Sequence, residues 1–541
     1  MSRPAQSEGD VAQNHKAKLG EWKVLPYDSQ IEAVHMALLP TGKVLYFSGF
    51  RELEAAKTET RLWNPKTGNI KAPQTPEDIF CAGHSFLPDG RLLSAGGTLE
   101  SRTGFKLPSW FIRLLRPIIQ ILAPIVYRII GNPVLQTGHT ILYLFDPKTE
   151  NWEFAGDMPE GRWYPTNTTL PDGRILILSG RDMAGGVGSK EKMRINRRVD
   201  VYDAEKGVKQ VATIPEGEME HGDQEKEHHG FPSLYPRMHV LPLSEREKGT
   251  YPAGKAFCSG YGPETKMLNL DTWEWEDVAK LTEERTRHDG CSVLLPLRPP
   301  DYRARILTCG GSEEGSGETA RPTNTAEMID FGEESPKWKL IDPMQDGRDH
   351  AGAMILPDGN VLVVGGSSKG LFGGSIYTVE VFDSVEDKWE VVAPITVPRG
   401  YHATTILLSD GRILVSGTTP YGNEELRMEV YSPGYLFKGE RPIITRVPES
   451  ISYGEPFEVE YESKEGLMRS AVLVRPGSMT HAFDMDQRYV ELEITDKATN
   501  RLTAKAPPDA HIAPPGYYML FLVSGDGVPS EAKFVHLPIK R

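Results

Sequence analysis

The stretch His402-Ala-Thr-Thr-Ile-Leu-Leu-Ser-Asp410-Gly411-Arg-Ile-Leu-Val-Ser-Gly417 decides the fold of this chain. It contains two short apolar runs that are joined by Asp-Gly, and the second run ends in Ser-Gly. An Asp-Gly pair between two apolar runs is a strong signal for a β-hairpin, because its tight turn requires positive φ angles. The broader form, two apolar runs joined by a turn with Gly-Gly or Ser-Gly at the end of the second, occurs seven times, in Met36–Gly49, Ser85–Gly97, Thr168–Gly180, Met238–Gly260, Ser292–Gly311, Gly352–Gly366 and Thr404–Gly417.

Each hairpin is followed by a third strand and usually by a fourth strand that carries tryptophan, as in Leu144–Trp152 and Val381–Trp389. Four short strands repeated about every 50 residues are typical of a kelch-type propeller, so seven copies predict seven blades. The segment Trp22–Leu25 precedes the first copy, whereas the last copy ends at Tyr431 without a tryptophan strand. We expect the first segment to complete the last blade, which removes an open sheet edge.

The pattern changes after residue 436. Apolar or alternating runs such as Phe457–Tyr461, Ser470–Val474 and Tyr517–Val523 are separated by Pro and Gly turns. About 100 residues with some seven strands are typical of an immunoglobulin-like β-sandwich. We therefore expect an all-β chain with a flexible tail over residues 1–20, a propeller over 21–436 and a sandwich over 437–541.

Composition limits the classes of function. A hydrophobic content of 39% with 25% charged residues is that of a globular protein, and 53 glycines and 42 prolines indicate many turns. The net charge of −14 argues against a partner such as nucleic acid, because no basic field attracts phosphates. The first ten residues contain no apolar signal segment. We expect a cytoplasmic or membrane-peripheral protein, or a secreted one whose leader has been removed.

One insertion breaks the repeat, because the turn glycines of the second and third hairpins lie 83 residues apart, against 48 for those of the first two. We expect the extra segment, residues 101–137, to be helical and to lie beside the strand ends that carry Cys81, Tyr164 and His402. Three arginines and two prolines in its apolar part, residues 110–130, argue against a membrane-spanning helix. An amphipathic helix in peripheral contact with a membrane, or an apolar lid, fits better. A dimer contact or a segment packed flat on the propeller is equally open.

Cys81, Tyr164 and His402 each precede the Asp-Gly turn of their hairpin by eight residues. A common offset from a common turn fixes both height and face in a strand, because side chains alternate with period two. We therefore expect a thiol, a phenol and an imidazole at one end of equivalent strands, where ordinary core positions would be Val or Ile. The same offset applies to a second set, whose members either contact substrate or merely close the propeller: Tyr235, Asp289 and His350.

Tyr401 and His402 are adjacent, so a strand end can direct both side chains to one metal ion. Two imidazoles and phenolate oxygens suit Cu(II). Because the propeller repeats offer only His402 in a suitable place, a second imidazole must come from elsewhere. The candidate is His481, which lies in the C-terminal segment Gly477–Arg488.

With these residues the chain closely resembles the galactose oxidase and glyoxal oxidase family of copper radical oxidases. The resemblance covers nearly the whole chain and implies a kelch propeller with a C-terminal sandwich of the early-set type. The Arg-Trp-Tyr form of one match looks more like the glyoxal oxidase branch. The matching stretches are Phe80–Gly83, Arg162–Tyr164, Arg399–His402, Thr480–Arg488 and Pro515–Phe521.

The resemblance implies that one copper ion is bound by Tyr164, Tyr401, His402 and His481. It also implies that the sulfur of Cys81 is joined to the ring of Tyr164, which forms a radical cofactor from the protein itself. A small aldehyde or primary alcohol would lose its proton to Tyr401 and a hydrogen atom to the Tyr164 radical. Dioxygen would then restore the resting enzyme and leave as hydrogen peroxide.

One feature departs from the family pattern. Galactose oxidase stacks a tryptophan over the crosslinked ring from the loop after that hairpin, but the corresponding residues 181–188 contain no aromatic side chain. Redox potential and substrate choice therefore do not follow from the resemblance. The rival hypothesis is a non-catalytic kelch scaffold that binds protein or carbohydrate, against which the intact ligand set argues. A different metal-dependent oxidoreductase on the same ligands is a third reading.

Overall fold

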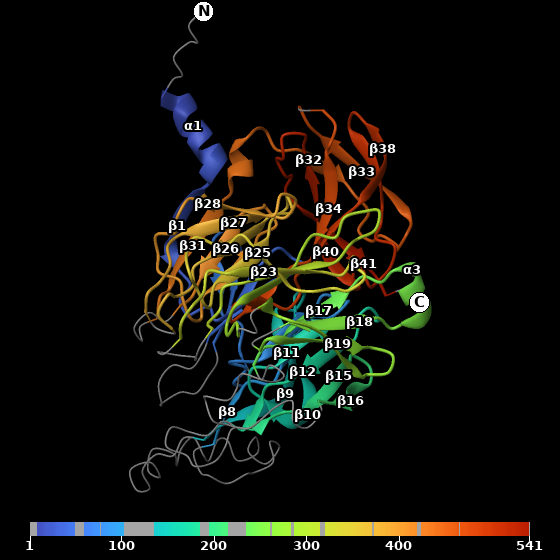
Figure 1. Ribbon diagram of the computed structural model, residues 1–541. Helices are drawn as coiled ribbons and strands as arrows, with labels where there is room; N and C mark the ends of the chain where they lie inside the picture. The colour runs from blue at the N-terminus through green and yellow to red at the C-terminus, as the bar shows by residue number, and fades with distance from the viewer. Residues whose placement is uncertain are drawn as a thin grey trace, which may run out of the picture.

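The computed structural model describes residues 8–48, 59–75, 77–101, 135–183, 194–214, 234–259, 262–282, 286–313, 320–370, 373–418, 424–464 and 466–539. The described strands form nine sheets, and the predicted all-β fold class is confirmed (Figure 1). Seven of the sheets are built on four antiparallel strands each and make a seven-bladed propeller, while the last two make the C-terminal sandwich.

Each blade runs from a fully buried inner strand to a more exposed outer strand. The inner strands are β2 (His35–Leu38), β6 (Gly83–Phe86), β11 (Thr166–Thr169), β17 (Arg237–Leu241), β21 (Cys291–Leu294), β25 (Gly352–Ile355) and β29 (Thr404–Leu407). The second strands are β3 (Val44–Phe47), β7 (Leu92–Ala95), β12 (Ile175–Leu178), β18 (Lys255–Ser259), β22 (Arg305–Cys309), β26 (Val361–Val364) and β30 (Ile413–Ser416). The third strands are β4 (Thr60–Trp63), β9 (Leu135–Asp146), β15 (Arg198–Asp203), β19 (Glu264–Asn269), β23 (Ala326–Asp330), β27 (Val379–Asp383) and β31 (Arg427–Ser432). The outer strands are β5 (Ile70–Lys71), β10 (Asn151–Arg162), β16 (Gly207–Thr213), β20 (Trp275–Lys280), β24 (Lys339–Ile341), β28 (Lys388–Val392) and β1 (Glu21–Asp28).

The propeller closes as the sequence predicts. Strand β1 pairs with β31, so that Trp22 lies opposite Tyr431 and their rings stack with centroids 4.8 Å apart. The first segment of the propeller thereby becomes the outer strand of the last blade, and the edge of β31 is covered.

Part of the segment predicted as a flexible tail, residues 1–20, has regular secondary structure. Residues Glu8–Leu19 form helix α1, which is mostly polar. The helix is anchored where it ends, because the carbonyl of Leu19 accepts hydrogen bonds from Tyr431 Oη and from the amide of Ala393. Further along the helix, Gln13 Nε2 donates to the carbonyl of Phe437. The helix is therefore held by contacts with the sixth and seventh blades and with the 3₁₀ turn η4 (Gly434–Phe437), although it has no apolar face.

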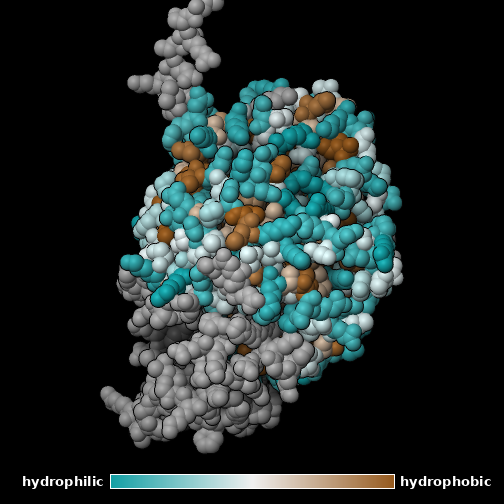
Figure 2. All heavy atoms as spheres, in the orientation of Figure 1, coloured by the Kyte–Doolittle hydropathy of each residue, from teal (hydrophilic) through white to brown (hydrophobic). Residues whose placement is uncertain are grey.

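The predicted insertion lies almost wholly outside the described residues, as does the membrane contact predicted for residues 110–130. Strands β8 (Thr98–Ser101) and β9 pair on either side of it, and β13 (Arg181–Met183) and β14 (Arg194–Ile195) extend the same sheet. In the described part of the chain, no helix is long and apolar enough to cross a membrane; α3 (Glu245–Thr250) has six residues. On the face drawn in Figure 2, the coloured apolar residues are scattered among hydrophilic ones.

The C-terminal domain is a sandwich of two four-stranded sheets, drawn in red in Figure 1. Side chains of alternate residues in β34 serve different cores, as period two requires. Ala471 and Leu473 fill the sandwich, whereas Val472 and Val474 share a core with the last blades of the propeller. The sheets are β32 (Ile443–Arg446), β33 (Pro456–Glu462), β39 (Arg501–Lys505) and β38 (Glu493–Ala498), and β37 (Tyr489–Glu491), β34 (Ser470–Val474), β40 (Gly516–Val523) and β41 (Lys533–Leu537).

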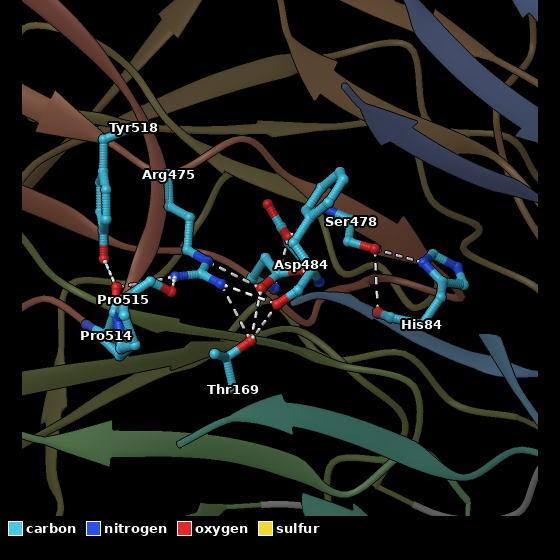
Figure 3. A network of polar contacts seen from close by, with 10 residues as sticks. His84, Thr169, Arg475, Ser478, Asp484, Pro514, Pro515 and Tyr518 are labelled. Carbon is cyan, nitrogen blue, oxygen red and sulfur yellow. Dashed lines mark hydrogen bonds and ion pairs between the residues drawn. The ribbon is translucent and has the colours of Figure 1, made fainter. Parts of the chain in front are cut away.

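A hairpin of the C-terminal domain joins the first blade. Its strands β35 (Ser478–Thr480) and β36 (Phe483–Asp484) extend the sheet beyond β2. The base of the hairpin is fixed by Arg475, which forms a buried ion pair of 2.9 Å with Asp486 and donates to the Thr169 hydroxyl of the third blade (Figure 3). The two domains therefore share a sheet, a core and a buried charge network.

Among the residues that the structure describes, four blades repeat one buried ion pair. In the third blade, Arg162 donates to the Ser179 carbonyl at the end of β12 and to the carboxylate of Asp200 in β15. The guanidinium of Arg162, the last residue of β10, thus ties the segment before the inner strand to the second and third strands of the third blade. The equivalent pairs of the fifth to seventh blades are Arg287–Glu327, Arg348–Glu380 and Arg399–Glu429.

We expect Glu327→Ala to destabilise the protein by about 3–5 kcal/mol, because it leaves the buried Arg287 charge without its carboxylate. The free energy of unfolding in urea measures the effect. Glu333→Ala is the control, since it breaks an ion pair with the largely exposed Lys339, and about 0–1 kcal/mol is expected there. Equal losses in the two variants would contradict the structural role of the buried pair.

Candidate metal centre

The residues with the common sequence offset occupy equivalent positions. Each lies two residues before the inner strand of its blade, and each has a left-handed backbone with φ between 42° and 67°. For residues other than glycine this conformation is unfavourable by about 1–2 kcal/mol, so the surrounding loops must hold it. Backbone hydrogen bonds between neighbouring blades do so: the amide of Tyr164 donates to the Cys81 carbonyl, and that of Tyr235 to the Tyr164 carbonyl, both at 2.9 Å. The six residues are Cys81, Tyr164, Tyr235, Asp289, His350 and His402.

The four residues predicted as metal ligands come together. The phenolic oxygens of Tyr164 and Tyr401 are 2.9 Å apart. Ring centroids are separated by 3.7 Å between Tyr401 and His402, 5.0 Å between His402 and His481 and 4.7 Å between Tyr164 and His481. Tyr401 and His402 are partly exposed, so the cluster reaches the surface on their side. The structure brings the predicted donors together, and their role as ligands stays a prediction.

His481 reaches this cluster from the C-terminal domain. It occupies the turn between β35 and β36 with Ala482, where both residues have positive φ, as in a two-residue hairpin turn. Its Nδ1 atom is 2.7 Å from the Thr480 hydroxyl, and its buried Nε2 atom has no hydrogen-bond partner among the described residues. An imidazole held by one nitrogen with the other left bare is the usual form of a metal-binding histidine. The turn therefore fits a metal ligand.

Burial keeps the acidic groups of the cluster in their neutral forms. It raises the pKa of the Tyr164 and Tyr401 phenols and of the Cys81 thiol well above their usual values. A cation in contact with the phenolic oxygens would lower these pKa values again. In the described part of the chain, no three His, Cys, Asp or Glu side chains are grouped for a metal ion. A metal centre here would depend on its tyrosine oxygens.

Cys81 and Tyr164 are in one buried contact cluster, which also contains Tyr235, Phe483 and Met485. The Cys81 side chain is fully buried within this cluster. The sequence places Cys81 correctly at the loop end of its strand, but the residue is as buried as a core position. The geometry is compatible with a bond between the sulfur and the Tyr164 ring.

Sequence reasoning missed a tryptophan that covers Tyr164. The ring of Trp163 stacks on that of Tyr164 with centroids 4.1 Å apart and planes inclined by 15°. Its backbone forms two hydrogen bonds with Arg181, at the start of the loop that contains no aromatic residue. Adjacent rings can stack because the left-handed Tyr164 interrupts the alternation of an extended strand. The stacking residue thus comes from the position directly before the tyrosine.

The second set of equivalent residues splits into two kinds. Tyr235 is a buried wall residue whose hydroxyl donates to the Ala82 carbonyl at 3.1 Å. His350 lies between two carboxylates, with Nε2 3.3 Å from Asp289 and Nδ1 3.1 Å from Asp349. Its ring also lies edge-on to Tyr401 at 5.1 Å. Asp289, with 21% of its side chain exposed, is therefore the member of the set that a substrate can reach.

Burial disfavours a charged His350, but the Asp289 and Asp349 carboxylates outweigh it and raise the pKa of His350 to about 8. Because this folded-state pKa exceeds the unfolded value of about 6.5, it stabilises the fold by about 2 kcal/mol. That contribution is fully present below about pH 6.5 and is lost as the pH rises through about 8. The free energy of unfolding of the metal-free protein, measured in urea at pH 6 and pH 9, should decrease more in the wild type than in Asp289→Asn. Identical pH dependences would contradict the prediction.

The comparisons with known proteins agree with the architecture. The model "Glyoxal oxidase N-terminus" matches residues 280–435, and "Galactose oxidase-like, Early set domain" matches residues 441–537. An aldehyde oxidase GLOX from Vitis pseudoreticulata is 29% identical over 504 residues, covering 87% of this chain and 84% of the relative. A galactose oxidase from Gibberella zeae is 25% identical over 546 residues, and the match covers 96% of this chain and 71% of the relative.

A solved structure is similar over almost the full length. It is a fungal alcohol oxidase in complex with copper, with 24% identity and a TM-score of 0.76, and the match covers 96% of this chain and 100% of the other. This likeness supports the fold. Together with the family models, it confirms the resemblance that the sequence motifs indicate.

Proposed function

We propose that this chain belongs to the galactose oxidase and glyoxal oxidase family and is a mononuclear copper radical oxidase. It would oxidise small aldehydes or primary alcohols with dioxygen and produce hydrogen peroxide. The observation that carries the proposal is the convergence of Tyr164, Tyr401, His402 and His481, with Cys81 in contact with Tyr164. The relatives named aldehyde oxidase and galactose oxidase support an oxidase.

Two phenols and two imidazoles would hold the metal, and the bare Nε2 of His481 is one of the donor atoms. Copper, when bound, would supply one electron of redox capacity and a place for the substrate oxygen. Tyr401 is partly exposed and is hydrogen-bonded to Tyr164, so it is placed to take the proton of a substrate hydroxyl. A thioether on Tyr164 would spread an unpaired electron onto sulfur and make oxidation of the ring easier. Trp163 covers one face of that ring and shields it from solvent.

A scaffold that binds protein or carbohydrate is the rival function. A binding scaffold does not require a thiol in contact with a stacked tyrosine. Nor does it require a histidine of the second domain among the residues of the propeller. A different metal on the same ligands is distinguished from copper by elemental analysis of the purified protein.

The cofactor provides the direct test. We expect the copper-free protein, after exposure to copper and air, to lose two hydrogens and to yield one crosslinked peptide that contains Cys81 and Tyr164. Cys81→Ser should abolish this change and most peroxide production, because a hydroxyl cannot form the thioether. Cys258→Ser, which alters another buried thiol, is the control and should crosslink normally. Full peroxide production by Cys81→Ser would contradict the radical mechanism.

His481 tests the metal site. We expect His481→Ala to weaken copper binding by more than about 100-fold, because it removes a donor atom. Thr480→Val removes only the hydroxyl beside Nδ1 and should weaken binding by about 10–100-fold, as changes around a ligand usually do. Titration against a copper chelator of known affinity measures both. Unchanged affinity in His481→Ala would exclude it as a ligand.

A further inference from the structure

Two histidines that the proposed chemistry does not use lie beneath Cys81. His35 belongs to β2 of the first blade and His84 to β6 of the second, and both side chains are fully buried. Burial lowers the pKa of both imidazoles, that of His84 to about 3, so each ring is neutral. A neutral imidazole carries one proton, and its two nitrogens are therefore one donor and one acceptor.

The hydrogen bonds of these rings form a chain with a fixed direction. The amide of Cys81 donates to His35 Nε2 at 3.0 Å, so the proton of His35 must be on Nδ1. That Nδ1 atom is 3.1 Å from His84 Nε2, which leaves the His84 proton on Nδ1 and facing the Ser478 hydroxyl. The hydroxyl in turn donates to the His84 carbonyl at 3.0 Å (Figure 3).

This chain of hydrogen bonds connects the C-terminal domain with Cys81, the cysteine of the proposed crosslink. Ser478 lies in β35, the strand that precedes His481, and it is hydrogen-bonded to the second blade. His35 cannot easily turn, because its ring stacks on Phe47 with centroids 4.4 Å apart and planes inclined by 5°. The hydrogen-bond chain ends at the backbone amide of Cys81, a residue whose φ is 62°.

The position of the Cys81 sulfur depends on this backbone. The left-handed conformation is unfavourable for cysteine, so without a partner for its amide the loop would relax toward other conformations. Bond formation between two groups is steeply sensitive to their placement, and a shift of about 1 Å can slow it about 100-fold.

We propose that His35 is a positioning residue for formation of the Cys81–Tyr164 thioether, and that Ser478 fixes its orientation through His84. The inference rests on the proposed function, because it requires that crosslink. In the reaction one hydrogen leaves the Cys81 sulfur, one leaves the Tyr164 ring, and a carbon–sulfur bond forms. The two protons and two electrons pass to dioxygen, which becomes hydrogen peroxide. The docked C-terminal domain therefore aligns the cysteine as well as supplying His481.

The test follows crosslink formation in the full chain, prepared without copper and then mixed with copper in air. The crosslinked fraction is measured over time by intact mass and peptide mapping. We expect His35→Phe, which keeps a flat ring beside Phe47 but offers no acceptor, to slow crosslinking at least about 10-fold. His35→Gln offers an amide oxygen and an N–H and should restore part of the rate. Copper affinity should not change, because His35 Nε2 is occupied by the Cys81 amide.

The matched control is His239→Phe. His239 is a buried histidine of β17 whose burial also lowers its pKa to about 3 and whose Nε2 is 2.8 Å from the Ser292 hydroxyl. It should crosslink at the wild-type rate. Ser478→Ala is a milder change at the far end of the hydrogen-bond chain, and it should also slow crosslinking. This variant provides the test if His35→Phe does not fold.

The outcomes separate the two hypotheses. No crosslink in the wild-type protein would overturn the proposed function itself. Normal crosslinking in the wild type together with normal rates in His35→Phe or Ser478→Ala would overturn only the positioning role. Equal slowing in His35→Phe and His239→Phe would also overturn it, because the cause would then be a general loss of core stability.

Discussion

The buried ion pair within each of four blades is the constraint on which the candidate centre depends. Arg162 in the third blade is fully buried and donates to two carbonyls and to Asp200. A desolvated guanidinium is stable only with these partners in place, so the loop before the inner strand has little freedom. Tyr164 follows two residues later, in the short segment between β10 and β11. In these four blades, charge pairs outside the site thus hold the segment that carries a residue with an unfavourable backbone: Tyr164, Asp289, His350 or His402.

A second constraint operates between the domains. Arg475 and Asp486 fix the base of the C-terminal hairpin against the third blade, and β35 adds to the sheet of the first blade. The tip of the hairpin, His481, then lies among residues from several blades. A centre assembled in this way forms only when both domains have folded and docked. This explains why one of its imidazoles can come from more than 300 positions after Tyr164 without loss of geometry.

Repeat offsets predicted much of the site because they depend on strand periodicity. Counting back from the Asp-Gly turn placed Cys81, Tyr164 and His402 at equivalent positions, and β1 closed the last blade as expected. The offsets could not indicate positive φ, since Cys and Tyr have no propensity for it and the offset is shared by residues of different types. For the same reason the stack of Trp163 on Tyr164 was missed, because alternation in an extended strand directs neighbouring rings apart. The anchoring of α1 by Leu19 has no signal in its polar sequence.

Burial and metal binding oppose each other at the phenols, and this opposition defines what the centre can hold. Burial raises the pKa of Tyr164 and Tyr401, and their oxygens lie 2.9 Å apart and share a hydrogen bond. A metal ion that binds here must therefore displace the protons of two poorly solvated phenols. A cation that is a weak Lewis acid cannot compete with these protons effectively. His481 gives up no proton on binding, because burial already keeps its imidazole neutral. A donor set of this kind favours a cation that binds imidazole nitrogen and phenolate oxygen strongly, and among divalent first-row metals the affinity for such donors is highest for Cu(II).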